Sequence, residues 1–179
     1  MRLLRFAAVV LFASTTTLSA QAPAHPVSDG VRDGWSGAKR NILGAAKVMP
    51  EAKYGFKPVD TVRTYGQILA HLAGANYEFC AGARGEKSPY TEDHFEKSAT
   101  TPAAIVRALQ DSMAYCDAAY SSLDDKRAAE VITGPFGGGK QARATVLNGN
   151  TGHNLEHYGN LVTYLRINGL VPPSSAPSK

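Results

Sequence analysis

Apolar residues recur at helical spacing in four stretches of this 179-residue chain, and no stretch shows the apolar–polar alternation of a half-buried strand. The third stretch is the clearest, because Thr101 is a suitable N-cap and Pro102 suits the first position of a helix. The first stretch has Ser28 or Asp29 as its N-cap, and the last one stops at Asn168-Gly169. The predicted helices cover residues 28–48, 64–83, 101–123 and 141–168.

Four helices of about 20 residues, joined by connections of varied length, favour an all-α fold: a four-helix bundle, either antiparallel or cross-connected. We expect one domain over residues 21–179. Residues 85–100 are polar and predict a long surface loop, which in a compact domain often borders a binding site. Residues 124–140 are a glycine-rich connector, and the short tail after Pro172 is predicted to be disordered.

The first 20 residues are typical of a secretory signal peptide rather than of a folded domain. Arg2 and Arg5 make the start positive, and an apolar run from Phe6 to Ser14 precedes small residues around Ala20. This run is too short to span a membrane, so we expect a periplasmic or secreted protein with no membrane partner once the signal is removed. An amphipathic anchor that stays attached is the alternative.

The charge of the chain does not indicate a nucleic-acid partner. Cleavage would remove two arginines and lower the formal net charge from +4 to +2, and the remaining basic residues are scattered rather than clustered with aromatic side chains. The segment from Gly134 to Lys140 imitates the start of a phosphate-binding P-loop, but Gln141 stands where that motif needs Ser or Thr. We therefore interpret this segment as a connector.

The two cysteines, Cys80 and Cys116, each lie within a predicted helix. In an oxidising compartment such a pair can form one disulfide that ties the two helices together. A buried pair of free thiols is the alternative, and both remain open because sequence spacing does not give the geometry of a disulfide.

Three histidines form a candidate metal site. His153 and His157 are one helical turn apart in the last predicted helix, so both imidazoles can face one ion, and His71 lies in the second predicted helix. Three imidazoles with open positions for water or substrate are typical of a catalytic rather than a structural metal centre. A single histidine is more often a core or surface side chain, so the hypothesis depends on the pair and on the polar residues beside it.

Polar residues share the face of the last helix that carries the histidines. On a helical wheel, Asn160 and Tyr164 fall within about 20° of the first histidine of the pair, and Asn150 falls about 60° away. Glu78 falls on the face of the second-helix histidine but about 10 Å along the axis, too far to be a metal ligand. We take Glu78, Asn160 and Tyr164 as candidate catalytic residues and Asn150 as a further group that orients the substrate.

Two segments resemble the DinB-like superfamily. One contains Gly66-Gln-Ile-Leu-Ala-His71-Leu-Ala-Gly-Ala-Asn76 with its lead-in from Phe56, and the other runs from His153-Asn-Leu-Glu-His157-Tyr to Gly169. The resemblance spans nearly the whole mature chain and implies a four-helix bundle of DinB/YfiT type. It also implies a divalent metal, commonly zinc or nickel, held by one histidine of the second helix and two of the last, here His71, His153 and His157.

The same resemblance implies a metal-dependent hydrolase or a group transferase that acts on a small molecule, and dimers are common among such proteins. Members with assigned activity include transferases and isomerases that use low-molecular-weight thiols. Export departs from this pattern, because a cytosolic thiol is not expected outside the inner membrane. A metal- or ligand-binding module without turnover is the alternative function.

Overall fold

The computed structural model describes residues 24–177, so the predicted signal peptide, residues 1–20, lies outside the described residues. The element order is α1 (Pro26–Val48), η1 (Glu51–Lys53), α2 (Tyr65–Arg84), α3 (His94–Ser98), α4 (Pro102–Ser121), α5 (Asp125–Ala129), β1 (Val131–Thr133), β2 (Lys140–Ala142), α6 (Arg143–Ile167) and η2 (Pro173–Ser175). Within residues 24–177, no helix is long and apolar enough to cross a membrane.

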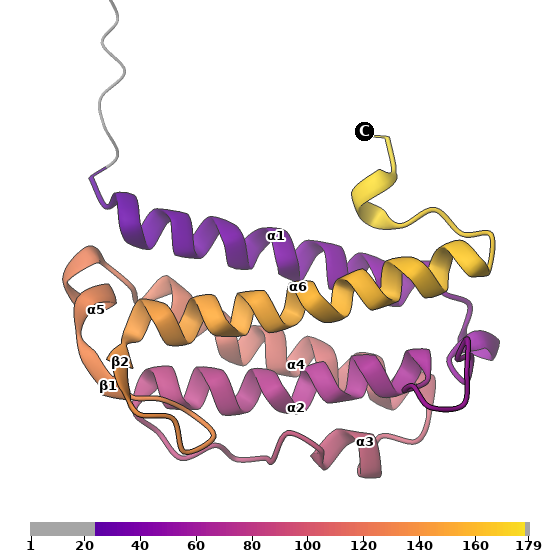
Figure 1. The fold of residues 1–179 in the computed structure, drawn as a ribbon, viewed down its shortest axis with the longest axis horizontal. Helices are drawn as coiled ribbons and strands as arrows, with labels where there is room; N and C mark the ends of the chain where they lie inside the picture. The colour runs from indigo at the N-terminus through magenta and orange to yellow at the C-terminus, as the bar shows by residue number, and fades with distance from the viewer. Residues whose placement is uncertain (1–23, 178–179) are drawn as a thin grey trace, which may run out of the picture.

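The four long helices, α1, α2, α4 and α6, pack side by side as a bundle (Figure 1). Helix α2 packs against both α4 and α6, and α1 covers the other side of these two helices. Helices α2 and α4 run in the same direction, since Gly66 lies next to Ile105 near their starts and Cys80 is bonded to Cys116 further along. The segment between them therefore returns along the length of the bundle (Figure 1). The predicted four-helix bundle is confirmed, in its cross-connected form.

The helix ends follow the predicted caps with one exception. Thr101 accepts a hydrogen bond from a backbone N–H of the first turn, as its predicted role of N-cap requires. Thr64, which the sequence marked only as the start of a helix, caps α2 in the same way. Helix α1, however, begins at Pro26, before the predicted caps, because proline fits the first turn. Ser28 is buried inside this helix, where its backbone N and its Oγ both donate to the carboxylate of Asp125.

The connector between α4 and α6 contains a helical turn, α5, and a β-hairpin that the sequence pattern did not predict. Strands β1 and β2 are antiparallel, with Ile132 opposite Gln141. Strands of three residues are too short to show a clear alternation, which explains the omission. The backbone N of Gly134 donates to the carbonyl of Gly139, so the glycine-rich segment closes this hairpin. It does not follow a parallel strand as a P-loop would.

The C-terminal tail differs from the disordered segment that its composition predicts. Residues 173–175 form η2, and the hydroxyl of Tyr158 lies 2.9 Å from both the backbone N and the Oγ of Ser174. Pro173 lies against Gly44 of α1, where a side chain on residue 44 would collide with its ring. The close approach at this glycine gives the tail a surface on which to pack.

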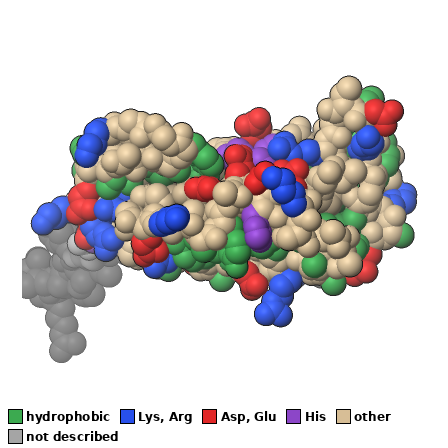
Figure 2. Space-filling model, turned by 90° about the horizontal axis from the view of Figure 1, so that it is seen from below, with side chains coloured by type: hydrophobic (Ala, Val, Ile, Leu, Met, Phe, Trp, Pro, Cys, Tyr) green, Lys and Arg blue, Asp and Glu red, His purple; other side chains and the backbone are tan. Residues whose placement is uncertain are grey.

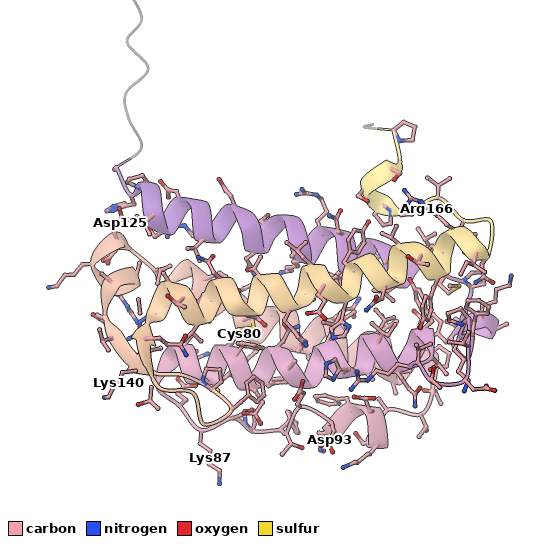
Figure 3. The ribbon with its side chains drawn as sticks, in the orientation of Figure 1. Cys80, Lys87, Asp93, Asp125, Lys140 and Arg166 are labelled. Carbon is pink, nitrogen blue, oxygen red and sulfur yellow. A yellow bond between two sulfur atoms is a disulfide. The ribbon has the colours of Figure 1, made fainter. Side chains whose placement is uncertain are left out.

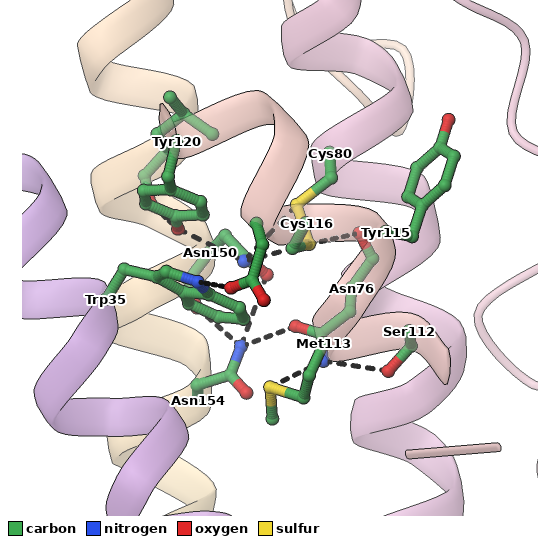
Figure 4. Close-up of a disulfide and its surroundings, with 12 residues drawn as sticks. Trp35, Asn76, Cys80, Ser112, Met113, Tyr115, Cys116, Tyr120, Asn150 and Asn154 are labelled. Atoms are coloured by element: carbon green, nitrogen blue, oxygen red, sulfur yellow. Dashed lines mark hydrogen bonds between the residues drawn. A yellow bond between two sulfur atoms is a disulfide. The ribbon is translucent and has the colours of Figure 1, made fainter. Parts of the chain in front are cut away.

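The centre of the bundle holds a disulfide among buried polar side chains (Figure 4). Cys80 and Cys116 are bonded, with their Cα atoms 5.3 Å apart, so α2 and α4 are covalently joined. Asn150 is fully buried beside them, with its Nδ2 3.7 Å from each sulfur and 3.2 Å from the hydroxyl of Tyr120. The prediction that Asn150 orients a substrate is therefore wrong, because its amide makes its contacts inside the core.

Candidate metal centre

The three predicted histidines meet between α2 and α6. One nitrogen atom from each of His71, His153 and His157 lies within 4.8 Å of the other two. The Nε2 atoms of His71 and His153 are 3.2 Å apart. Two nitrogens bound to one tetrahedral zinc ion at about 2.0–2.1 Å would be about 3.3 Å apart, so the observed spacing fits a shared ion.

Burial keeps these imidazoles in the neutral form. Burial is the main reason why the pKa of His71 is lowered to about 4 and that of His153 to about 4. It is also the main cause that lowers the pKa of His157. The positive charge of Arg63 lowers all three pKa values further. Neutral imidazole is the form that binds a metal, so the site is ready for a cation near pH 7 without losing a proton.

The donor set of the cluster fits a divalent cation. The buried Nδ1 of His153 has no hydrogen-bond partner among residues 24–177. If each neutral ring carries its proton on Nδ1, the facing Nε2 atoms of His71 and His153 both have lone pairs free to bind one cation. Imidazole nitrogen suits zinc and nickel among the divalent metals. The residues present therefore fit a divalent metal ion, in agreement with the coarser part of the prediction.

Two glutamates of the segment between α2 and α4 lie against His71. Glu96 Oε1 is 3.1 Å from His71 Nδ1, and Glu92 Oε1 is 3.3 Å from His71 Nε2. A ring that turns the lone pair of Nε2 toward a metal carries its proton on Nδ1, where it can donate to Glu96, the usual carboxylate–histidine–metal arrangement. Glu96 also accepts a hydrogen bond of 3.0 Å from Arg63 Nε.

A cavity of about 790 Å³ opens beside His157. Asn160 and Tyr164, two of the predicted catalytic candidates, line it. The hydroxyl of Tyr164 donates to the backbone carbonyl of Arg63, and Asn160 Nδ2 lies 3.4 Å from His157 Nδ1. The other lining residues come from the loop before α2 and from its first turn: Lys57, Pro58, Asp60, Thr61, Val62, Arg63, Gln67 and Ile68.

The third candidate, Glu78, lines a different cavity, of about 470 Å³, together with residues of the β-hairpin. Burial raises the pKa of its carboxyl group, and the negative charge of Glu92 adds to this effect. The structure thus brings Asn160 and Tyr164 to the cavity of His157, and it does not bring Glu78 there.

A sequence model of the DinB superfamily matches residues 35–161 of the chain. The chain belongs to the DinB superfamily. No curated protein matches it. Among solved structures, a DinB-like protein from Bacillus cereus ATCC 10987 has 16% sequence identity and a TM-score of 0.63, over 81% of this chain and 95% of that one. The divalent metal expected from the resemblance to this superfamily therefore agrees with the three histidines, whose nitrogen atoms could hold such an ion.

Two further structures share this DinB fold. YfiT from Bacillus subtilis, described as a probable metal-dependent hydrolase with an unusual four-helix bundle topology, has 17% identity and a TM-score of 0.61, over 87% of this chain and 94% of YfiT. The mycothiol-dependent maleylpyruvate isomerase has 14% identity and a TM-score of 0.61, over 75% of this chain. The present chain spans about 60% of the length of that isomerase.

Sequence reasoning did not identify Glu92, Glu96 and Arg63 in this DinB protein. A partial signal existed, since the long polar segment was expected to border a site. The path of this segment over α2 could not be predicted from the sequence. A Cβ on Gly74 would come within 2.0 Å of the carbonyl oxygen of Glu92, so the segment can lie this close to α2 only because residue 74 has no side chain. Figure 3 shows Lys87 and Asp93 on this segment as it runs along α2. In Figure 2, acidic and basic side chains gather around histidines in the middle of one face.

Proposed function

We propose that this DinB superfamily protein binds one divalent metal ion, zinc or nickel, through His71, His153 and His157, and that it catalyses a hydrolytic or group-transfer reaction on a small molecule. The convergence of three neutral imidazoles beside an open cavity carries this proposal. A metal held there supplies a Lewis acid and lowers the pKa of a bound water. YfiT and the maleylpyruvate isomerase, by their descriptions, represent the hydrolytic and the thiol-dependent chemistry on this fold.

The surrounding residues have separate roles in this proposal. Glu96 orients the ring of His71 through Nδ1, and Glu92 Oε1, 3.3 Å from the Nε2 of the same ring, can accept a proton at the cluster. Asn160 and Tyr164 contact the substrate in the cavity. Because this cavity is large enough for a small molecule, it favours an enzyme over a module whose metal is closed off by protein groups.

We also propose that the protein is exported. The buried disulfide between Cys80 and Cys116 supports this, because disulfides form and persist in oxidising compartments. An exported enzyme would lack a cytosolic thiol, which favours hydrolysis over thiol-dependent transfer. Mass spectrometry of protein recovered from the periplasm or the medium tests export, with a mature N-terminus expected between residues 20 and 24. The homodimer stays a prediction.

Metal analysis of the purified protein tests the proposed site. We expect about one equivalent of metal in the wild type, and none retained after purification of His153→Ala. His94→Ala is the matched control, since His94 begins α3 and packs on Tyr90 outside the cluster. Equal metal contents in the wild type and in a folded His153→Ala variant would contradict the proposal.

A further inference from the structure

We propose that the cavity beside His157 binds the oxyanion group, a carboxylate or a phosphate, of a small organic acid, and that Arg63 is the side chain that selects this group. The inference rests on the proposed metal-dependent function and names the substrate class of that site.

Three side chains that line the cavity have free hydrogen-bond donors. Within residues 24–177 the side chain of Arg63 makes its hydrogen bond through Nε alone, which leaves both terminal nitrogens free to donate. Lys57 Nζ contacts the backbone oxygen and the carboxylate of Asp60, each at 3.1 Å, and keeps a third proton. Gln67 uses its side-chain oxygen in the helix cap, so its amide nitrogen is available as well. A ligand rich in acceptors satisfies these groups.

The charge around the cavity also favours an anion. Arg63 and Lys57 both line it, and Asp60 is the one carboxylate in the described lining. The side chain of Asp60 is 100% exposed, so water screens its charge. The side chain of Arg63 is 44% exposed and thus open to a ligand from solvent. Its two free terminal nitrogens form a planar fork that matches a carboxylate or a phosphate.

Arg63 also sets the direction in which such a ligand lies. It is held in place at two points, because its backbone carbonyl accepts from the Tyr164 hydroxyl and its Nε donates to Glu96. Glu92 and Glu96 place negative charge against His71, and this charge repels an anionic ligand from that side of the site. The oxyanion group therefore lies on the free side of Arg63, and the rest of the molecule extends toward His157.

Calorimetric titration of the metal-free purified protein tests the inference with three probes: succinate, inorganic phosphate and the uncharged succinamide. We expect the wild type to bind at least one of the two anions, and to bind succinamide at least about tenfold more weakly. Tighter binding of succinate identifies a carboxylate as the preferred group, and tighter binding of phosphate identifies a phosphate. Arg63→Gln should weaken binding of the preferred anion about tenfold or more, and Arg63→Lys should weaken it less.

Two further variants separate selection by Arg63 from structural support. Lys53→Met is the matched control for charge, because Lys53 Nζ bonds to Asn168 outside the cavity; its Kd should equal that of the wild type. Glu96→Gln removes the negative charge beside Arg63 and should tighten anion binding about twofold or more. If Arg63 only supported Glu96, both Arg63→Gln and Glu96→Gln would weaken binding alike.

Equal affinities for the preferred anion and succinamide, a wild-type Kd in Arg63→Gln, or no anion binding by the folded wild type would each overturn the inference. Metal content, measured on each preparation before its metal is removed for the titration, reports separately on the proposed function. A protein that takes up no metal but binds the anion through Arg63 would contradict the metal site alone, and the reverse result would contradict the anion site alone.

Discussion

His71 makes more contacts with the rest of the centre than the other two histidines do. Its Nε2 faces His153 and Glu92, and its Nδ1 faces Glu96, so both ring nitrogens are engaged. Such a carboxylate fixes the tautomer and the angle of the ring and makes the opposite nitrogen a better ligand. In the proposed site, Glu96 would therefore raise the metal affinity without touching the metal.

We therefore expect Glu96→Gln to weaken metal binding about 10- to 100-fold. A glutamine can still accept the Nδ1 proton, but it carries no charge to strengthen the ligand. The measurement is a competition titration of zinc or nickel against a chromophoric chelator.

Asp93→Asn is the matched control for Glu96→Gln, since Asp93 lies three residues earlier and bonds to Lys97 and Thr91 rather than to a histidine. It should leave the metal affinity unchanged. Equal affinity in Glu96→Gln and Asp93→Asn would show that the carboxylate beside His71 has no part in metal binding.

At the scale of elements, the segment from residue 85 to residue 101 matters as much as the helices that it joins. It carries Glu92 and Glu96 to the metal centre because α2 and α4 run in the same direction, and the chain must pass back over α2 between them (Figure 1). The contact occurs at Gly74, where the backbone of Thr91 and Glu92 takes the space of a side chain.

Gly74→Ala should destabilise the fold by about 1–3 kcal/mol and weaken metal binding. The new methyl group would meet the backbone of residue 92 rather than the end of a flexible side chain, so the segment must shift away from α2. Urea denaturation and the chelator competition described for Glu96→Gln measure the two effects.

Gly30→Ala is the control, because no atom lies within 4 Å of a Cβ at this position of α1. It should stabilise the protein by up to about 1 kcal/mol through helix propensity alone. If Gly74→Ala behaved like Gly30→Ala, the segment could not be resting on α2 as described.

For the whole molecule, the sequence predicted what local spacing determines. The four helices, the cap at Thr101, and the facing pair His153 and His157 all depend on residues a few positions apart. The roles of Arg63 and Glu96 depend on how a 17-residue segment crosses a neighbouring helix, which no local pattern encodes. A helical wheel also shows in which direction a side chain points from its helix, but not which other element that side chain contacts.

Asn150 and Glu78 show the consequence of that gap. The inward face of α6 contacts both α1 and α2, and Asn150 points to the disulfide between α2 and α4 instead of to the histidines (Figure 4). Glu78 lies on the same helix as His71 but reaches the cavity that the β-hairpin lines. Whether a side chain on the inward face of a helix belongs to the site can therefore be decided only when the packing of all four helices is known.

The disulfide joins the two parallel helices at the centre of the bundle, and its removal should lower the stability of the whole molecule. The bond between Cys80 and Cys116 spans 36 residues. By restricting the conformations of the unfolded chain, it contributes about 3–4 kcal/mol to the free energy of unfolding in the loop-entropy treatment. We expect Cys80→Ala/Cys116→Ala to lose about 2–4 kcal/mol in urea denaturation, since Asn150 also loses two sulfur contacts but keeps the Tyr120 hydroxyl.

Wild-type protein reduced in urea and refolded under a strong reductant is the control for this double variant, because it keeps every side-chain atom but lacks the bond. Its loss of stability isolates the effect of the bond from that of the small cavity. Metal content should stay near that of the wild type in both cases, since the histidines sit on α2 and α6 while the bond joins α2 to α4. Unchanged stability in the reduced protein would contradict a role for the disulfide in holding the bundle together.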